Sequence, residues 1–470
     1  MSNLKSYVIH TIGGGWGKET IEENLIKVSV IRGTDFPKLE KLDFSSVPIR
    51  FETLKKIESR TLQVGDLIIE VSGGSASSGQ RTGRCLYITQ EILDNLGKYV
   101  IPASFCRLLR LDKEKINSKF IYYQIAEMHL SDQIGIYENQ STGISNFQFN
   151  LFLDEIFPKI TDLNKQNSIV DIFNSIDQKI QVNTKINQTL EQIAQALFKS
   201  WFVDFDPVRA KVQALSDGLS LEQAELAAMQ AISGKTAEEL TALSQTQPDC
   251  YSELAETAKA FPCEIVEVDG VEVPKGWEVS TISECSLKIQ NGGTPKRSNL
   301  EFWENGEIPW LSSGEVCNNK VLVQSKEYIT DLGLKGSAAK LIPPYSTLVA
   351  IYASPTAGKC AFSGFETSTN QAVCAIIPKE EYTFFNYYHL QLQEKYFANQ
   401  ASGSAQQNIS KKIIEETPVL IPNKVILKKF NLLAKPIMNK TIENLKENNN
   451  LERKRDLLLP KLLNGDIQNE

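Results

Sequence analysis

The chain has 470 residues, enough for about three domains of ordinary size, and its 41% hydrophobic and 23% charged residues are typical of a globular protein with sizeable cores. Its formal net charge of -7 at first argues against a nucleic-acid partner, and no stretch approaches the roughly 18 consecutive apolar residues of a membrane span. Eight scattered cysteines without a C-x-x-C pair, three histidines and an N-terminus without a signal-peptide pattern predict a reduced, metal-free, cytoplasmic protein.

Residues 1–162 are predicted to form a mixed α/β domain. It opens with the glycine cluster Gly13–Lys18, which is not a P-loop because the spacing is wrong and no Ser or Thr directly follows the lysine. Short β-type runs follow, and Lys119–Gly135 has the pattern of a helix. Between two of the runs, Ser72–Arg84 is too small and polar to pack, so we predict an exposed loop there.

Residues 163–202 are predicted to form a single long helix. Between Lys165 and Trp201 no Pro or Gly interrupts the pattern, and the apolar residues recur three and four apart around two central asparagines. About 35 residues would make a rod of roughly 50 Å, and so narrow a stripe favours a coiled-coil partner over an ordinary core helix. The predicted seam consists of Ile169, Phe173, Ile176, Ile180, Asn183, Asn187, Leu190 and Leu197.

Residues 203–275 hold much of the negative charge. They carry fourteen acidic and five basic residues, a charge of -9, so the rest of the chain carries +2 and could still present basic faces. Leu219–Ala260 should be helical, with breaks near Gly234 and at Thr246–Asp249, and Glu264–Pro274 should be a hairpin. We interpret the segment as a spacer with a helical appendage, and an acidic interaction surface is the alternative.

Residues 276–422 repeat the plan of the first domain. Tyr137–Pro158 and Phe397–Pro418 share an Asn-Gln pair, a Gly and a Pro at an offset of about 260 positions, which indicates a tandem duplication. The second copy is also followed by a helical segment, residues 423–470, which is the natural partner of the first long helix. Its seam residues would be Phe430, Leu433, Ile437, Leu451 and Leu458. The predicted fold class is therefore α+β, with two similar α/β domains joined by two long helices in an antiparallel coiled coil.

No catalytic cluster is evident in the sequence. Ile342–Tyr345 is similar to the Asn-Pro-Pro-Tyr signature of amino-methyltransferases, but Ile342 cannot accept a hydrogen bond, so a turn at a strand edge is the better interpretation. The histidines His10, His129 and His389 suggest neither a Ser-His-Asp set nor a metal site. What remains is polar loops in two copies whose exposed residues differ, a pattern that suits two sites of one type reading two different things.

Five blocks of the chain, in order, resemble the specificity subunit of type I restriction-modification systems. They are Leu190–Lys211, Val273–Val279, Ile289–Val316, Ala398–Pro422 and Glu452–Ile467. The resemblance implies two target-recognition domains that each read half of a bipartite, asymmetric site in double-stranded DNA. It also implies a coiled coil that acts as a ruler and binds two methylation subunits, so four residues inserted after Asn183 are predicted to lengthen the preferred spacer.

The resemblance further implies that this chain has no catalytic residues and binds no cofactor or metal itself. The methylation subunits would carry adenine-N6 methyltransferase chemistry with S-adenosylmethionine, and two restriction subunits, which are motor nucleases, can join for cleavage. Two alternatives stay open: a two-domain scaffold without DNA readout, and a self-sufficient methyltransferase, which the missing cofactor loop disfavours.

Arg and Lys contact guanine edges and phosphates, whereas Asn and Gln read adenine. On that chemistry the DNA-facing candidates of the first copy are Trp16, Lys18, Arg32, Gln80, Arg81 and Arg84. Those of the second copy are Thr294, Lys296, Arg297, Trp310, Ser312, Ser313, Gln406 and Gln407.

Overall fold

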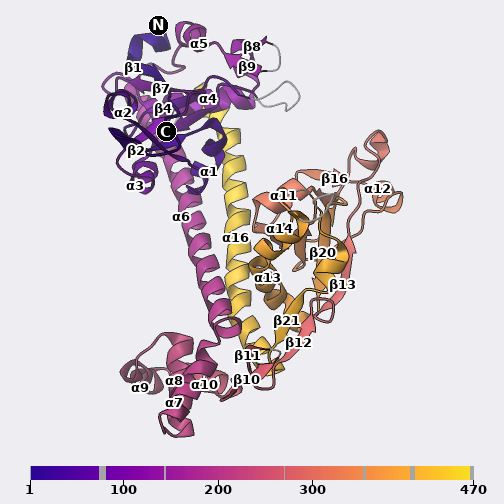
Figure 1. Ribbon diagram of the computed structural model, residues 1–470. Coiled ribbons are helices and arrows are strands. Elements are labelled where there is room, and N and C mark those ends of the chain that lie inside the picture. Colours follow the sequence, from indigo (N-terminus) through magenta and orange to yellow (C-terminus); the bar gives the residue numbers. More distant parts are fainter. Residues whose placement is uncertain are drawn as a thin grey trace. The chain divides into compact units, whose positions relative to one another are not determined.

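The computed structural model describes residues 2–73, 81–141, 144–268, 270–352, 356–402 and 408–465 (Figure 1). The chain divides into two compact units. Unit 1 comprises Met1–Lys185 and Glu447–Glu470, and unit 2 comprises Ile186–Lys446. The fold mixes helices with several small sheets, so the predicted α+β class is confirmed.

Unit 1 is built on two sheets whose inner faces are buried. The four-stranded sheet is antiparallel, in the order β1 (Val8–Gly13), β7 (Cys106–Leu111), β4 (Leu67–Glu70) and β5 (Cys85–Tyr87). In the three-stranded sheet the central β2 (Leu25–Ile31) pairs antiparallel with β3 (Ile49–Thr53) and parallel with β6 (Val100–Pro102). The predicted helix is present as α4 (Ser118–Leu130). The other elements are α1 (Phe36–Leu39), α2 (Leu54–Arg60), α3 (Gln90–Leu96), β8 (Glu138–Ser141), β9 (Ile144–Phe147) and α5 (Phe149–Glu155).

Unit 2 repeats this topology. Its larger sheet has the order β13 (Ser286–Asn291), β20 (Val373–Pro378), β17 (Thr347–Ala350), β18 (Cys360–Ser363) and β15 (Val321–Leu322). Its smaller sheet again has a central strand, β14 (Ile308–Leu311), which pairs antiparallel with β16 (Glu327–Ile329) and parallel with β19 (Ser368–Thr369). The other elements are α11 (Ser313–Asn318), α12 (Asp331–Lys335), α13 (Thr383–Leu392), α14 (Glu394–Ser402), α15 (Lys411–Glu415), β12 (Glu278–Thr281) and β21 (Pro418–Ile421).

The duplication extends to single hydrogen bonds. After the first strand of the larger sheet in each unit, Gly14 N donates to Cys106 O at 2.9 Å and Gly292 N donates to Val373 O at 3.1 Å. The matched Asn-Gln pairs do not correspond in structure, however, because one lies in strand β8 and the other in helix α14. The duplication is therefore visible in the topology, but the local sequence match that suggested it joins segments of different secondary structure.

The two long helices are present as α6 (Leu163–Phe202) and α16 (Lys424–Leu463). Within unit 1, Asn183 Nδ2 donates to Asn448 Oδ1 at 2.9 Å. Within unit 2, Asn444 Nδ2 donates to Asn187 Oδ1 at 2.8 Å. Each predicted asparagine layer thus contains an asparagine of α16. The residue numbers of the partners increase along α6 and decrease along α16, as expected for antiparallel helices.

The seam of α16 differs from the prediction at Leu433, whose side chain is 46% exposed. The inward row instead advances in steps of four, through Phe430, Ala434, Met438 and Ile442, all of them buried. The reason is that α16 also packs on its own sheet domain, where Tyr345 Oη donates to Asn439 Oδ1 at 3.1 Å. The other predicted seam residues are buried, as Ile169, Phe173, Asn183 and Phe430 are, or partly buried, as Ile176, Ile180, Asn187, Leu190, Leu197, Ile437, Leu451 and Leu458 are.

The asparagine layer of unit 1 yields a stability prediction. Asn183 and Asn448 are 1% and 7% exposed. Asn183→Leu alone therefore leaves the buried amide of Asn448 without this partner and should lower the free energy of unfolding by about 1 to 3 kcal/mol. The double variant N183L/N448L should recover that loss or exceed the parent, because two leucines replace both partners. A double-mutant cycle by urea unfolding measures this, and additive losses would show that the two amides do not act as a pair.

Residues 203–275 form a helical appendage of unit 2, as predicted. Helices α7 (Asp206–Ser216), α8 (Leu221–Ser233), α9 (Ala237–Thr246) and α10 (Pro248–Ala260) precede the hairpin of β10 (Ile265–Val268) and β11 (Val271–Pro274). A small core of Ala228, Met229, Leu240 and Ala258 holds the last three helices together. Among the described helices, none combines the length and apolar character needed to cross a membrane.

Candidate nucleic-acid interface

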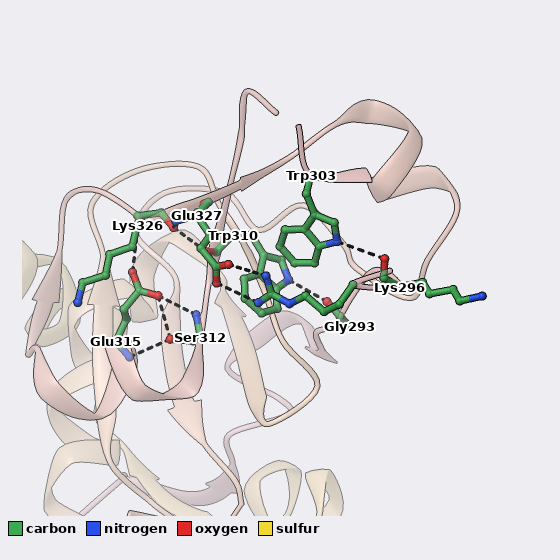
Figure 2. Close-up of polar contacts among 10 residues, drawn as sticks. Gly293, Lys296, Trp303, Trp310, Ser312, Glu315, Lys326 and Glu327 are labelled. Carbon is green, nitrogen blue, oxygen red and sulfur yellow. Dashed lines mark hydrogen bonds and ion pairs between the residues drawn. The ribbon is translucent and has the colours of Figure 1, made fainter. Parts of the chain in front are cut away.

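A cluster around Arg297 in unit 2 brings together residues from the glycine turn and two strands (Figure 2). The guanidinium carbon lies 3.7 Å from the ring centroid of Trp303 and 4.8 Å from that of Trp310. Both terminal nitrogens donate to the carboxylate of Glu327, one of them at 2.9 Å. Arg297 lowers the pKa of the Glu327 carboxyl through these bonds, so the pair stays charged at neutral pH.

The two indoles are fixed by the turn itself. Trp310 Nε1 donates to Gly293 O at 3.0 Å, and Trp303 Nε1 donates to Lys296 O at 3.3 Å. Only glycine fits at position 292, because a Cβ there would lie 2.2 Å from Thr369 O. The turn therefore lies flat against the neighbouring strand, and a half-exposed arginine is held in one orientation.

Two lysines extend from the rim of this cluster. Lys296 and Lys326 are exposed, and Figure 2 shows both side chains pointing away from it. Neither forms an ion pair with any residue that the structure describes. Because an exposed cation without a carboxylate partner is available to an anion such as a DNA phosphate, these two side chains suit a backbone contact.

Other second-copy candidates have structural roles. Trp310 is only 2% exposed, so it is a platform for Arg297 and not a DNA-facing residue. Ser312 is the N-cap of α11, where its hydroxyl accepts from Glu315 N at 3.3 Å, and Ser313 is half-buried. Thr294 is exposed and donates to Gln371 Oε1. Gln406 and Gln407 lie outside the described residues.

In unit 1, the corresponding turn carries an indole, and strand β3 supplies the arginine that lies on it. Trp16 is 38% exposed, and the guanidinium carbon of Arg50 lies 4.6 Å from its ring centroid. Lys18 is exposed and pairs with Glu22. A polar cavity of about 470 Å³ opens beside the turn, lined in part by Lys56 and Arg60.

The remaining first-copy arginines are held by carboxylates and stabilise the domain. Arg32 bonds the buried Asp35, and Arg84 makes a two-point contact with Glu70 at 2.8 Å for both bonds. Arg81 pairs with Asp132 at 2.9 Å and Glu138 at 3.0 Å, and it lowers the pKa of Asp132. All three guanidinium nitrogens of Arg81 are bonded, and the side chains of Arg32 and Arg84 are less exposed than that of Arg297, so these arginines are poor candidates for base readout. Gln80 lies outside the described residues.

The candidate residues predicted from the sequence did not include Glu19, Arg50, Trp303 and Glu327, which the structure places beside the two turns. Only Trp303 could have been found from the sequence, as an aromatic residue close to Arg297. The segment Ile342–Tyr345 forms a turn at a strand edge, as predicted. Ile342 makes an isolated β-bridge with Thr367, and Tyr345 has φ +62°. No group of His, Cys, Asp and Glu suited to a metal ion occurs within the described ranges.

One sheet topology thus occurs twice, each time with an arginine on an indole near the turn after the first strand of the larger sheet, which defines a protein with a duplicated domain. Residues 274–453 match the family described as type I restriction modification DNA specificity domain. The chain is 43% identical over 396 residues to the type I restriction enzyme HindI specificity subunit of Haemophilus influenzae, covering 82% of this chain and 84% of that relative.

Two further matches are more distant. The MjaIX specificity subunit of Methanocaldococcus jannaschii is 25% identical, over 77% of this chain and 71% of that protein. A crystal structure of a type I S subunit from M. genitalium aligns over 98% of this chain and 95% of that chain, with a TM-score of 0.48 and 14% identity. The chain belongs to the family of type I restriction enzyme specificity subunits, and it is the non-catalytic, DNA target-recognition subunit of such a system.

Proposed function

We propose that each unit reads one half of a bipartite, asymmetric site in double-stranded DNA. The target-recognition domains would be residues 1–162 and 276–422. The observation that carries this proposal is that one topology occurs twice with largely different side chains on the same turn, Trp16–Glu19 in one unit and Thr294–Arg297 in the other. A repeated frame with different exposed residues suits two different base sequences better than one symmetric site.

The helix pair, residues 163–202 and 423–470, would set the length of the unread spacer and bind two methylation subunits. S-adenosylmethionine would be bound by those subunits, which supply the adenine-N6 transfer, and restriction subunits would join the same assembly for cleavage. Exposed apolar side chains on the helices, such as Ile193 at 50% and Leu432 at 60%, support a further helical partner. The acidic segment 203–275 would remain a spacer.

The test is to co-express the chain with its methylation subunit in a host without other adenine methylation and to map N6-methyladenine along the genome. Methylation at one split, asymmetric motif is the expected result. A stable complex without sequence-specific methylation, and without salt-dependent affinity for duplex DNA, would instead favour a scaffold that does not read DNA.

Arg297→Ala should weaken or relax recognition in one half-site only. If Arg297 donates to a guanine edge, the loss amounts to about 1 to 3 kcal/mol of discrimination at one position. Methylation mapping with the variant measures it, with Lys412→Ala as the control, since Lys412 is 76% exposed and pairs with Glu416 within its own segment. Equal losses in both half-sites would contradict separate readers.

A further inference from the structure

The hydrogen bonds that anchor the two glycine turns set a residue-by-residue correspondence between the units. Gly14 matches Gly292, because each donates its N–H to the equivalent strand, β7 or β20. The next glycines match as well, since Gly15 N donates to Pro102 O at 2.9 Å and Gly293 N to Thr369 O at 2.8 Å. The turns can therefore be compared position by position.

One side chain on the turn is the same in both units. Four residues after Gly14 stands Lys18, and four residues after Gly292 stands Lys296. Both lysines are exposed, and the only ion pair that the structure describes for either is a surface pair between Lys18 and Glu22, whose side chains are 58% and 51% exposed. Surface pairs of this kind contribute little, so a phosphate can replace the carboxylate.

The residue after the lysine has the opposite charge in the two units. Glu19 occupies it in unit 1 and pairs with Arg50 of β3 at 3.1 Å. Arg297 occupies it in unit 2 and pairs with Glu327 of β16 at 2.9 Å. In both units an acid–base pair thus joins the turn to the strand antiparallel to the central one, but the two charges have exchanged places.

The arginine of each exchanged pair also lies on an indole, although the two indoles occupy different positions, Trp16 in the turn itself and Trp303 six residues after Arg297. The guanidinium carbon of Arg50 lies 4.6 Å from the Trp16 centroid, and that of Arg297 lies 3.7 Å from the Trp303 centroid. Stacking and a carboxylate together fix the half-exposed guanidinium of Arg297. In unit 1 the side chain of Arg50 is only 18% exposed, so Glu19, at 76%, is the accessible member of the pair. Surface pairs alone do not need such support for stability, which points to a need for orientation.

We infer that this turn makes the contacts by which each unit recognises its DNA half-site. Lys18 and Lys296 make the equivalent contact to a DNA phosphate in the two half-sites, and the exchanged pairs Glu19–Arg50 and Arg297–Glu327 distinguish the bases. An arginine held by its carboxylate keeps further N–H donors for a guanine edge, and a carboxylate can accept from the cytosine amino group. The inference rests on the proposed function and specifies which side chains carry it out.

The experiment measures the salt dependence of duplex binding for Lys18→Gln and Lys296→Gln in complex with the methylation subunit. Each variant should lower the slope of log affinity against log salt by about one, without changing the recognised bases. Arg50→Ala and Arg297→Ala should instead relax base identity, each in a different half-site. Thermal unfolding of each variant checks that the fold is retained.

Matched controls come from the opposite end of the same first strand. Lys115 pairs with Asp112, whose N donates to Tyr7 O just before β1, and Lys412 lies in α15, where Glu415 O accepts from Ser283 N just before β13. Lys115→Gln and Lys412→Gln should leave the slope unchanged. The inference is overturned if Lys18→Gln and Lys296→Gln leave the salt slope unchanged, as the controls do, while the parent complex still methylates a split motif. If the parent complex methylates no split motif, the proposed function is overturned as well.

Discussion

Trp201→Ala is expected to lower the free energy of unfolding of unit 2 by about 3 to 5 kcal/mol, the largest stability effect of any single side chain considered. Trp201 lies in the last turn of α6 with no exposed surface, and its ring meets Phe261 edge-on at 5.1 Å and Phe430 at 6.2 Å. It therefore ties α6, α16 and the appendage of residues 203–275 to one core. Urea unfolding, with hydrogen exchange of the α6 and α16 amides, measures the effect.

Two further variants sharpen this test. Trp201→Phe keeps an aromatic ring and removes an indole N–H for which the described structure holds no acceptor, so it should cost less than about 1.5 kcal/mol. Leu433→Ala removes a side chain that the heptad pattern places in the seam but that is 46% exposed, and it should change stability by no more than about 0.5 kcal/mol. Similar losses for L433A and W201A would mean that the core does not lie where the structure places it.

The helices were predictable because their signal is long and local. Lys165–Trp201 carries an unbroken apolar period, and the observed α6 extends it by two residues at the start and one at the end. The face that α16 buries was less predictable, because it depends on a second contact, with the sheet domain, as at Asn439. Heptad spacing indicates only the face that packs on α6, so it placed Leu433 in the seam incorrectly.

The candidate site was only partly predictable, for a related reason. Glycines next to Lys18 and Lys296 marked both turns, because a backbone that approaches its neighbour closely excludes a Cβ. Exposed arginines were less informative: the carboxylates that hold Arg81 lie 51 and 57 positions away, so the sequence gives no sign that its donors are already used. For the same reason, Arg50 gave no signal as the partner of Trp16.

Lengthening both long helices by one turn is expected to abolish methylation at the original motif and to move it to a longer spacer. Because Asn183 bonds Asn448 and Asn444 bonds Asn187, four residues added after Lys185 must be matched by four after Lys446. At a rise of 1.5 Å per residue the pair gains about 6 Å, which corresponds to about two base pairs. Genome-wide mapping of N6-methyladenine measures the new spacing.

Two related variants separate a ruler from a merely damaged protein. Four residues added to α6 alone, the insertion that the sequence suggested, prevent Asn183 and Asn187 from pairing with α16 at the same time. Contrary to that expectation, methylation should then be lost without a new motif, because a buried amide loses its partner. Seven residues added to both helices preserve the heptad phase and should shift the spacer by about three base pairs, with better stability than the four-residue pair. Methylation that stays at the original spacing, with the methylation subunits still bound, would mean that the distance between half-sites is set elsewhere than in the helix pair.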